Sequence, residues 1–230
     1  MLKQLTRFTG LALFVGASAA LFTSTAMAQS EQQKLVDDAQ KSLSGFLHDS
    51  QMTWLQQNFN RAKAVIIAPE LLKAGFIFGG SGGRAVVVAR DPKSGKWLGP
   101  VFYSMATASV GFQAGISVSE NVTLVMTDKG FNSLLASTFK VGGDASVAAG
   151  PIGAGAKSDV VADLISFSRA KGLYGGLNLD GTVVHASADW NELYYQKKPV
   201  LPPDILVRMS TRAKGADKLL GDVARGAGKK

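Results

Sequence analysis

Ala64-Val65-Ile66-Ile67-Ala68 is a short run of apolar, largely β-branched residues that ends at Pro69. A second run, Arg84-Ala85-Val86-Val87-Val88-Ala89-Arg90, follows four glycines at positions 79, 80, 82 and 83. Runs of this length and composition, bounded by Pro and Gly, are typical of buried β-strands. The glycines between the two runs predict a turn with positive φ, since Gly adopts that conformation without a steric penalty.

Further strands are predicted on the C-terminal side of these two runs. Pro92, Ser94 and Gly95 indicate a turn, after which residues 96–103 form the returning strand of a hairpin. Apolar residues alternate over 109–119, as in a half-buried strand. The remaining predicted strands are 122–126, 160–168, 173–179 and 182–186, the last two joined as a hairpin by Asp180-Gly181.

Helical periodicity appears mainly at the two ends of the chain. An amphipathic helix is predicted over 31–48, followed by a short helix that buries Met52, Leu55 and Phe59. Shorter helices are expected around 131–139 and 190–195, and an amphipathic helix with a basic face between 205 and 225. Neither a βαβ alternation nor a repeat is present. We therefore expect an α+β fold, mainly an antiparallel sheet or partial β-barrel, with N-terminal helices and a C-terminal amphipathic helix packed outside.

The first 28 residues have the pattern of a secretory signal peptide. Lys3 and Arg7 precede an uncharged stretch, and Ala26-Met27-Ala28 supplies small residues at a cleavage site. The alternative is an uncleaved membrane anchor, since the stretch is long enough to span a bilayer. The sequence thus predicts an exported, periplasmic protein with peripheral membrane association. The sequence contains no Cys, which excludes disulfides, Cys-ligated zinc and thiol chemistry.

Basic residues are concentrated at the C-terminus. The formal net charge is +8, but residues 29–207 contain 16 basic and 15 acidic side chains. Residues 208–230 contain seven basic and two acidic side chains. A nearly neutral body with a basic tail argues against nucleic acid as a partner and favours an anionic surface. We therefore divide the chain into a signal peptide (1–28), one domain (29–207) and a basic tail (208–230).

One motif suggests catalysis. Gly79-Gly80-Ser81-Gly82-Gly83 matches the G-x-S-x-G pattern of serine hydrolases, and Asp144, Asp159 or Asp163 precedes His185 in the matching order. The pattern requires a helix after the serine, whereas residues 84–90 are strand-like, so a turn is the better interpretation. Backbone N–H groups of that turn, beside Arg84, would suit a phosphate. We predict no enzyme, no cofactor and no metal site.

Several spaced motifs, taken in order, resemble the SYLF domain family over about residues 35–206. They are Arg61-Ala62-Lys63-Ala64-Val65, Lys73-Ala74-Gly75-Phe76 running into the glycines, Ser109-Val110-Gly111-Phe112-Gln113-Ala114-Gly115, Ser146-Val147-Ala148-Ala149-Gly150-Pro151, and Ser166-Phe167-Ser168-Arg169-Ala170-Lys171-Gly172-Leu173. Phe167 and Ala170 depart from the family, where Tyr and Ser are common. The resemblance implies a lipid-binding domain.

What the resemblance implies for function is recognition of anionic phospholipid or phosphoinositide-like headgroups, in envelope lipid binding or transport. The basic residues within the matching motifs are the candidate lipid-binding residues: Lys63, Lys73, Arg84, Arg169 and Lys171. For each of them, a solvated charge or a structural ion pair is the competing interpretation. A structural or protein-interaction factor of the cell envelope is the alternative function, and a Ser81 hydrolase ranks third. The lipid, the membrane and the oligomeric state stay open.

Overall fold

The computed structural model describes residues 30–75, 78–110, 115–156, 159–170, 173–174, 179–209, 211 and 215–228. The predicted signal peptide lies outside these residues, as does the alternative that it is a membrane anchor. Within the described ranges, every helix is too short or too polar to cross a bilayer.

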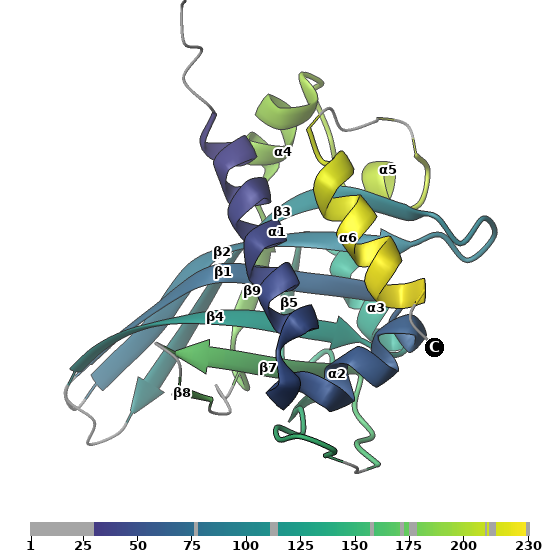
Figure 1. Ribbon diagram of the computed structural model, residues 1–230. Coiled ribbons are helices and arrows are strands. Elements are labelled where there is room, and N and C mark those ends of the chain that lie inside the picture. Colours follow the sequence, from purple (N-terminus) through teal and green to yellow (C-terminus); the bar gives the residue numbers. More distant parts are fainter. Residues whose placement is uncertain are drawn as a thin grey trace, which may run out of the picture.

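A single curled sheet forms the centre of the protein (Figure 1). Its strand order is β5-β9-β3-β2-β1-β4-β7-β6, and β8 pairs with β7. All pairs are antiparallel except β6 with β7. The strands are β1 (Ala64–Gly75), β2 (Phe78–Arg90), β3 (Trp97–Val110), β4 (Gly115–Val125), β5 (Thr138–Lys140), β6 (Val147–Ala149), β7 (Leu164–Ala170), β8 (Leu173–Tyr174) and β9 (Val183–Ala186).

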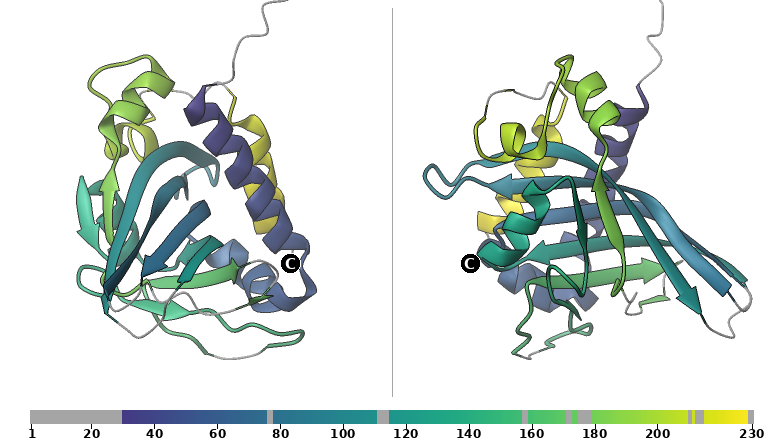
Figure 2. Two further views of the ribbon diagram at one scale, coloured as in Figure 1. Left: turned by 90° about the vertical axis from the view of Figure 1, so that its left-hand side faces the viewer. Right: turned by 180° about the vertical axis from the view of Figure 1, so that it is seen from behind.

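Helices cover parts of both faces of the sheet (Figure 2). One face contacts α1 (Glu31–His48), α2 (Thr53–Asn58) and α6 (Asp217–Gly228), and the opposite face contacts α3 (Asp128–Leu135) and α5 (Pro202–Leu206). Helix α4 (Ala188–Tyr195) lies beside β3. The α+β class and the outer helices are confirmed, and α1 has the predicted bounds. Ser30 caps α1 by accepting a hydrogen bond from the Gln33 N–H.

Two hydrophobic cores follow from the alternation of side chains along the strands. On the α1 side, Val65, Val86, Phe102 and Val122 pack against the helices. On the other side, alternate residues such as Ile66 pack beneath α3 and α5. Because successive residues of a strand point to opposite faces, each continuous apolar run contributes to both cores. This explains why residues 64–68 and 85–89 are apolar at every position and fully buried.

The predicted glycine turn is wrong. Residues 79–83 lie inside β2, paired with β1 on one side and β3 on the other. None of these glycines has positive φ, and at Gly83 glycine is required for close backbone approach. A β-bulge in β1 between Ile67 and Glu70 brings the Glu70 carbonyl oxygen within 2.2 Å of where a Cβ of Gly83 would lie. The phosphate cradle expected from turn N–H groups is therefore not formed by these residues.

Two predicted connections also differ from the structure. The alternating stretch 109–119 is not one strand, because β3 ends at Val110 and β4 begins at Gly115, and the two strands are separated by β2 and β1 in the sheet. Asp180-Gly181 does form a turn, with Gly181 at φ 81°. It does not join a hairpin, since β8 pairs with β7 whereas β9 pairs with β3 and β5. Local turn signals identified the turn but not the pairing partners.

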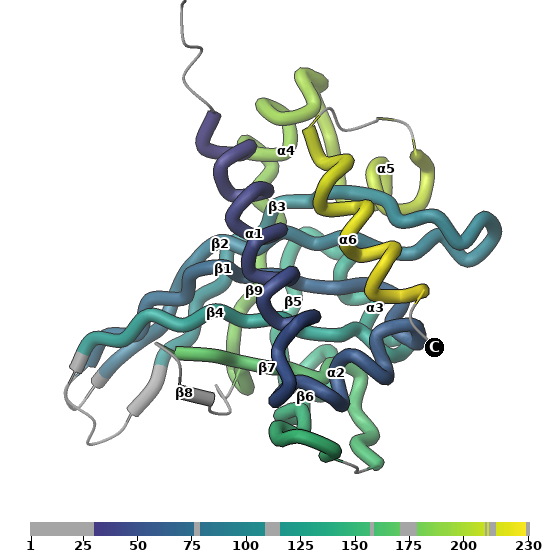
Figure 3. Tube along the Cα trace, in the orientation of Figure 1, coloured from purple at the N-terminus to yellow at the C-terminus, as the bar shows by residue number. Residues whose placement is uncertain are grey.

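Helix α6 lies within the range that the sequence sets apart as a basic tail. Its apolar face is buried against α1, with Leu219 and Val223 in the core. Gln40 on α1 donates a hydrogen bond to Asp222 on α6. The tube view in Figure 3 shows the two helices side by side on one face of the sheet. A large part of this range is therefore packed against the domain.

The close approach at the bulge predicts that an alanine destabilises the protein more at position 83 than at the neighbouring position 82. Gly83→Ala should lower the free energy of unfolding by about 2–4 kcal/mol, because the new methyl group meets a backbone carbonyl that cannot rotate away. Gly82→Ala is the matched control, since its Cβ would lie 3.4 Å from the Met105 carbonyl oxygen. Urea unfolding of both variants checks this, and an equal loss of stability in both would contradict it.

Candidate functional site

Arg169 links the sheet to helix α1 through ion pairs and a ring contact. Its Nη2 lies 2.6 Å from Glu120 Oε2, and its Nη1 lies 3.4 Å from Asp49 Oδ2. The guanidinium also stacks 5.0 Å from the centre of the Phe46 ring. A Cβ on Gly45 would come within 2.8 Å of the guanidinium, so glycine makes room for it. These contacts satisfy the charge of Arg169 within the protein.

The other candidate basic residues are not gathered around Arg169. Lys63 Nζ forms an ion pair of 2.8 Å with Asp128 Oδ1 at the start of α3. Arg84 lies with its guanidinium 3.9 Å from the centre of the Trp190 ring and Nη1 3.5 Å from Ser187 Oγ. Lys73 faces the opposite side of the sheet from Arg84, as the register described below shows. Lys171 lies outside the described residues. The described candidates therefore do not form one basic pocket.

The catalytic alternative fails on geometry. Ser81 and His185 point to opposite faces of the sheet, because Ser81 is paired with Thr107 and His185 with Ser104, an odd number of residues away along β3. His185 Nδ1 lies 2.7 Å from Thr138 Oγ1. Hydrogen bonds from Thr127 and from the backbone of Ser146 lower the pKa of Asp163 to about 2. That carboxylate therefore holds loops together.

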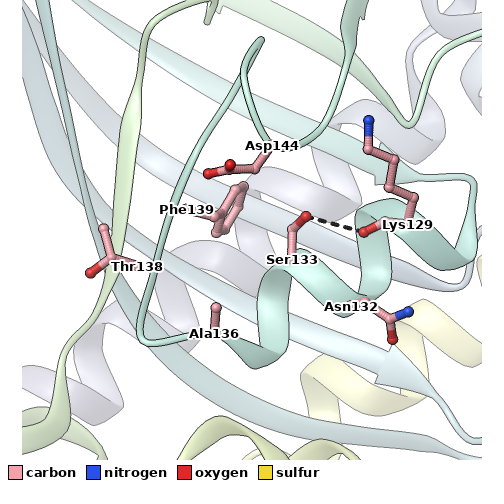
Figure 4. Close-up of a pocket in the computed structure, with 7 residues that line it drawn as sticks. All are labelled: Lys129, Asn132, Ser133, Ala136, Thr138, Phe139 and Asp144. Carbon is pink, nitrogen blue, oxygen red and sulfur yellow. Dashed lines mark hydrogen bonds between the residues drawn. The ribbon is translucent and has the colours of Figure 1, made fainter.

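A shallow depression of about 650 Å³ lies between α3 and β5 (Figure 4). Five of its seven lining residues have polar side chains, and the Ser133 hydroxyl donates to the Lys129 carbonyl within it. Lys129 Nζ lies 3.7 Å from Asp163, and Asp144 accepts a hydrogen bond from the Lys140 N–H. Ser133, Lys129 and Asp144 are thus engaged in local contacts, and the depression contains none of the candidate basic residues that the structure describes.

A surface more distinctive than this depression lies on the outer halves of the long strands, which we call the projecting end of the sheet. Strands β1 to β4 contain 11 to 14 residues, and their outer halves extend beyond α1 in Figure 1. On the α1 side, the first row of paired residues beyond the buried core is polar. This polar row consists of Glu70, Arg84, Ser104, His185, Glu120 and Arg169. It contains both signs of charge, so it is not a basic patch.

Beyond the polar row, the same face becomes apolar. Leu72 is paired with Val118 on β4 and Gly82 on β2, and Gly82 is paired with Ala106, which is paired with Val183. Ile116 is 76% exposed, Leu72 47% and Val183 42%. We call this surface the open apolar face, and it comprises Leu72, Ala74, Ala106, Ala108, Ile116, Val118 and Val183.

The reverse side of the same strands is polar. Ser117, Lys73, Ser81 and Thr107 are paired in one row across β4, β1, β2 and β3. The Thr107 hydroxyl is 2.6 Å from that of Thr182. We call this side the hydroxyl face. Because one side is aliphatic and the other is hydroxylated, the projecting end of the sheet is amphipathic.

Sequence reasoning did not identify the open apolar face, although part of the signal is visible. Leu72 and Ala74 alternate with Lys73, and Ile116 and Val118 alternate with serines. Such alternation predicts a strand with one apolar side. It does not reveal whether a helix covers that side, because coverage depends on where α1 crosses the sheet.

Because Arg169 links the sheet to helix α1, its replacement should reduce the stability of the protein. Arg169→Ala should lower the free energy of unfolding by about 2–3 kcal/mol, since it leaves Glu120 and Asp49 without their partner and removes packing on Phe46. Lys63→Ala is the matched control and should cost less than about 1 kcal/mol, because its ion pair with Asp128 is largely exposed. Thermal or urea unfolding measures the loss of stability in both variants. Comparable losses would contradict a structural role for Arg169.

Comparison with known proteins places the chain in a family. The family model described as "Las17-binding protein actin regulator" (Ysc84) matches residues 106–225, from the middle of β3 into α6. The yeast (Saccharomyces cerevisiae) "LAS seventeen-binding protein 3" is 33% identical over 169 residues, which is 68% of this chain but 36% of the yeast protein. The human "SH3 domain-containing YSC84-like protein 1" is 31% identical over 140 residues, 59% of this chain and 40% of the human protein. The matched region thus spans less than half the length of these two relatives. The chain belongs to the Ysc84 family, which is the SYLF family that its motifs resemble.

Proposed function

We propose that this protein is an exported lipid-binding module that accommodates the acyl chains of anionic phospholipid on the open apolar face. The observation that supports this is the exposure of Leu72, Ile116 and Val183 on one uncovered surface. Aliphatic side chains scattered singly on a surface are ordinary, whereas one register row of this face contains Val118, Leu72, Ala106 and Val183, interrupted only by Gly82. Apolar residues gathered in this way favour an apolar ligand.

The energetics suit a reversible interaction. Transfer of an aliphatic side chain from water to an apolar phase contributes about 1.5–3 kcal/mol when it is fully buried, and these residues are already partly covered. Ile116, Leu72, Val118 and Val183 together would then contribute several kcal/mol, which the cost of association reduces. Such a balance is appropriate for a module that docks and releases.

The residues that we expect to bind the lipid headgroup differ from those that the sequence motifs suggest. Arg169 and Lys63 are engaged in ion pairs, so we assign them no headgroup. Arg84 is exposed and lies in the polar row next to the open apolar face, which makes it the candidate best placed for a phosphate. The general excess of basic residues adds long-range attraction to an anionic surface, which salt screens.

The test is binding to vesicles of phosphatidylcholine mixed with phosphatidylglycerol. Ile116→Asp should reduce the co-sedimented fraction by about tenfold or more, since a carboxylate would have to enter an apolar phase. Val161→Asp is the matched control, because Val161 is 95% exposed on the loop before β7, away from the open apolar face. Equal binding by both variants and wild type would refute the proposal.

A second arm separates a membrane surface from a single lipid molecule. Native mass spectrometry of the purified protein with a short-chain phosphatidylglycerol, kept below its micelle concentration, detects a one-to-one complex. A complex that Ile116→Asp abolishes would indicate a lipid carrier. Vesicle binding without such a complex would indicate peripheral docking on a bilayer.

Protein binding is the second candidate function, because the relatives are named for it. The yeast protein is named as Las17-binding, and the family description includes "actin regulator". The open apolar face would also suit a protein partner. Capture of a purified, lipid-free protein by wild type but not by Ile116→Asp, without any vesicle binding, would favour this alternative.

A further inference from the structure

Strand β4 has an open edge along its outer half. It pairs with β1 from Gly115 to Val125, but with β7 only from Glu120 to Val125. Among the residues that the structure describes, no strand pairs with the other edge of residues 115–119. Figure 1 shows β4 continuing outward past the end of β7. Backbone N–H and C=O groups along such an edge are available to a further strand.

This edge lacks the proline and charged side chains by which proteins often block strand addition. Proline, lysine and other charged side chains on an edge prevent unwanted pairing. Residues 115–119 read Gly-Ile-Ser-Val-Ser and contain none of them. The first charged residue is Glu120, which is held by Arg169 at the point where β7 begins to pair. Within the described part of the chain, the edge is therefore open to a partner strand.

The same five residues are complementary to themselves. In an antiparallel pair centred on Ser117, Ile116 lies opposite Val118 of the second copy, and Ser117 lies opposite Ser117 of that copy. Aliphatic side chains then meet on one face and hydroxyls meet on the other, which is the favourable pattern for cross-strand pairs. No like charges are brought together. With a two-fold axis through Ser117, each copy makes the same contacts with the other, as a closed dimer requires.

We propose that the outer half of β4 is a self-association edge, through which two copies join into one continuous sheet. The two open apolar faces then become one larger surface on the same side of the joined sheet. The paired edge is short, so the buried area falls below that of a standard interface and the dimer forms reversibly. Two joined faces on one membrane would bind more tightly than one, because the second contact becomes intramolecular.

Ser117 allows this proposal to be tested separately from lipid binding, because it lies on the hydroxyl face and is exposed. In sedimentation velocity, the average mass of wild type should rise from one chain toward two as the concentration increases from about 1 to 100 μM, a range typical of small interfaces. Ser117→Lys should keep a mass of one chain, since two ammonium groups would face each other across the axis. Its unfolding midpoint should match that of wild type.

A cross-link provides a second measurement, since the chain contains no Cys. Ser117→Cys should form a disulfide-linked dimer on mild oxidation, because directly opposed residues of an antiparallel pair bring their Cβ atoms within disulfide reach. Lys93→Cys, in the exposed turn between β2 and β3, is the control and should stay uncross-linked. A wild type that stays at one chain, or cross-linking no greater at 117 than at 93, would overturn the proposal. Ser117→Lys should still bind vesicles, so loss of dimerisation and loss of lipid binding are distinguishable.

Discussion

Helix α1 crosses strands β1, β2 and β4 on one face of the sheet, and the outer halves of these strands extend beyond it. A strand of 12 residues is about 40 Å long, whereas a helix is only about 10 Å wide. The inner half of this face is therefore buried beneath α1, α2 and α6, and the helices that the structure describes leave the outer half uncovered. Most of the functional features described above follow from this difference in coverage.

The charged side chains near this boundary contribute to the structure more than to recognition. Arg169 joins β7 to β4 and to the end of α1, and Lys63 joins the start of β1 to α3. Arg169 is thus explained by a folding requirement, since a partly buried guanidinium needs its carboxylates. The surface left for binding is aliphatic, with Arg84 at its border.

Local patterns in the sequence predicted the elements better than their partners. The apolar periodicity of residues 31–48 and the continuous runs at 64–68 and 85–89 were sufficient for α1 and for the two central strands, because each pattern is strong and local. The glycines at 79–83 predict a turn but lie within β2, where Gly83 accommodates a bulge in the neighbouring strand. Asp180-Gly181 likewise formed a turn without the hairpin that usually accompanies it.

The candidate site was the least predictable part of the molecule. Motif membership pointed to cationic residues, but only the folded chain shows that Arg169 is paired and that Ser81 and His185 face opposite sides of the sheet. The exposed residues Leu72, Ile116 and Val183 come from three separate strands, and their placement on one face depends on register. No short window of sequence contains that information.

The central claim is that one face of the projecting sheet contacts acyl chains while the other remains in water. Nitroxide labels on Ala106→Cys, on the open apolar face, and on Ser81→Cys, on the hydroxyl face, measure this directly by electron paramagnetic resonance. With anionic vesicles, we predict that the label at 106 becomes accessible to oxygen and shielded from a water-soluble relaxation agent, whereas the label at 81 stays accessible to that agent. Equal accessibility of the two labels to the water-soluble agent would contradict the account.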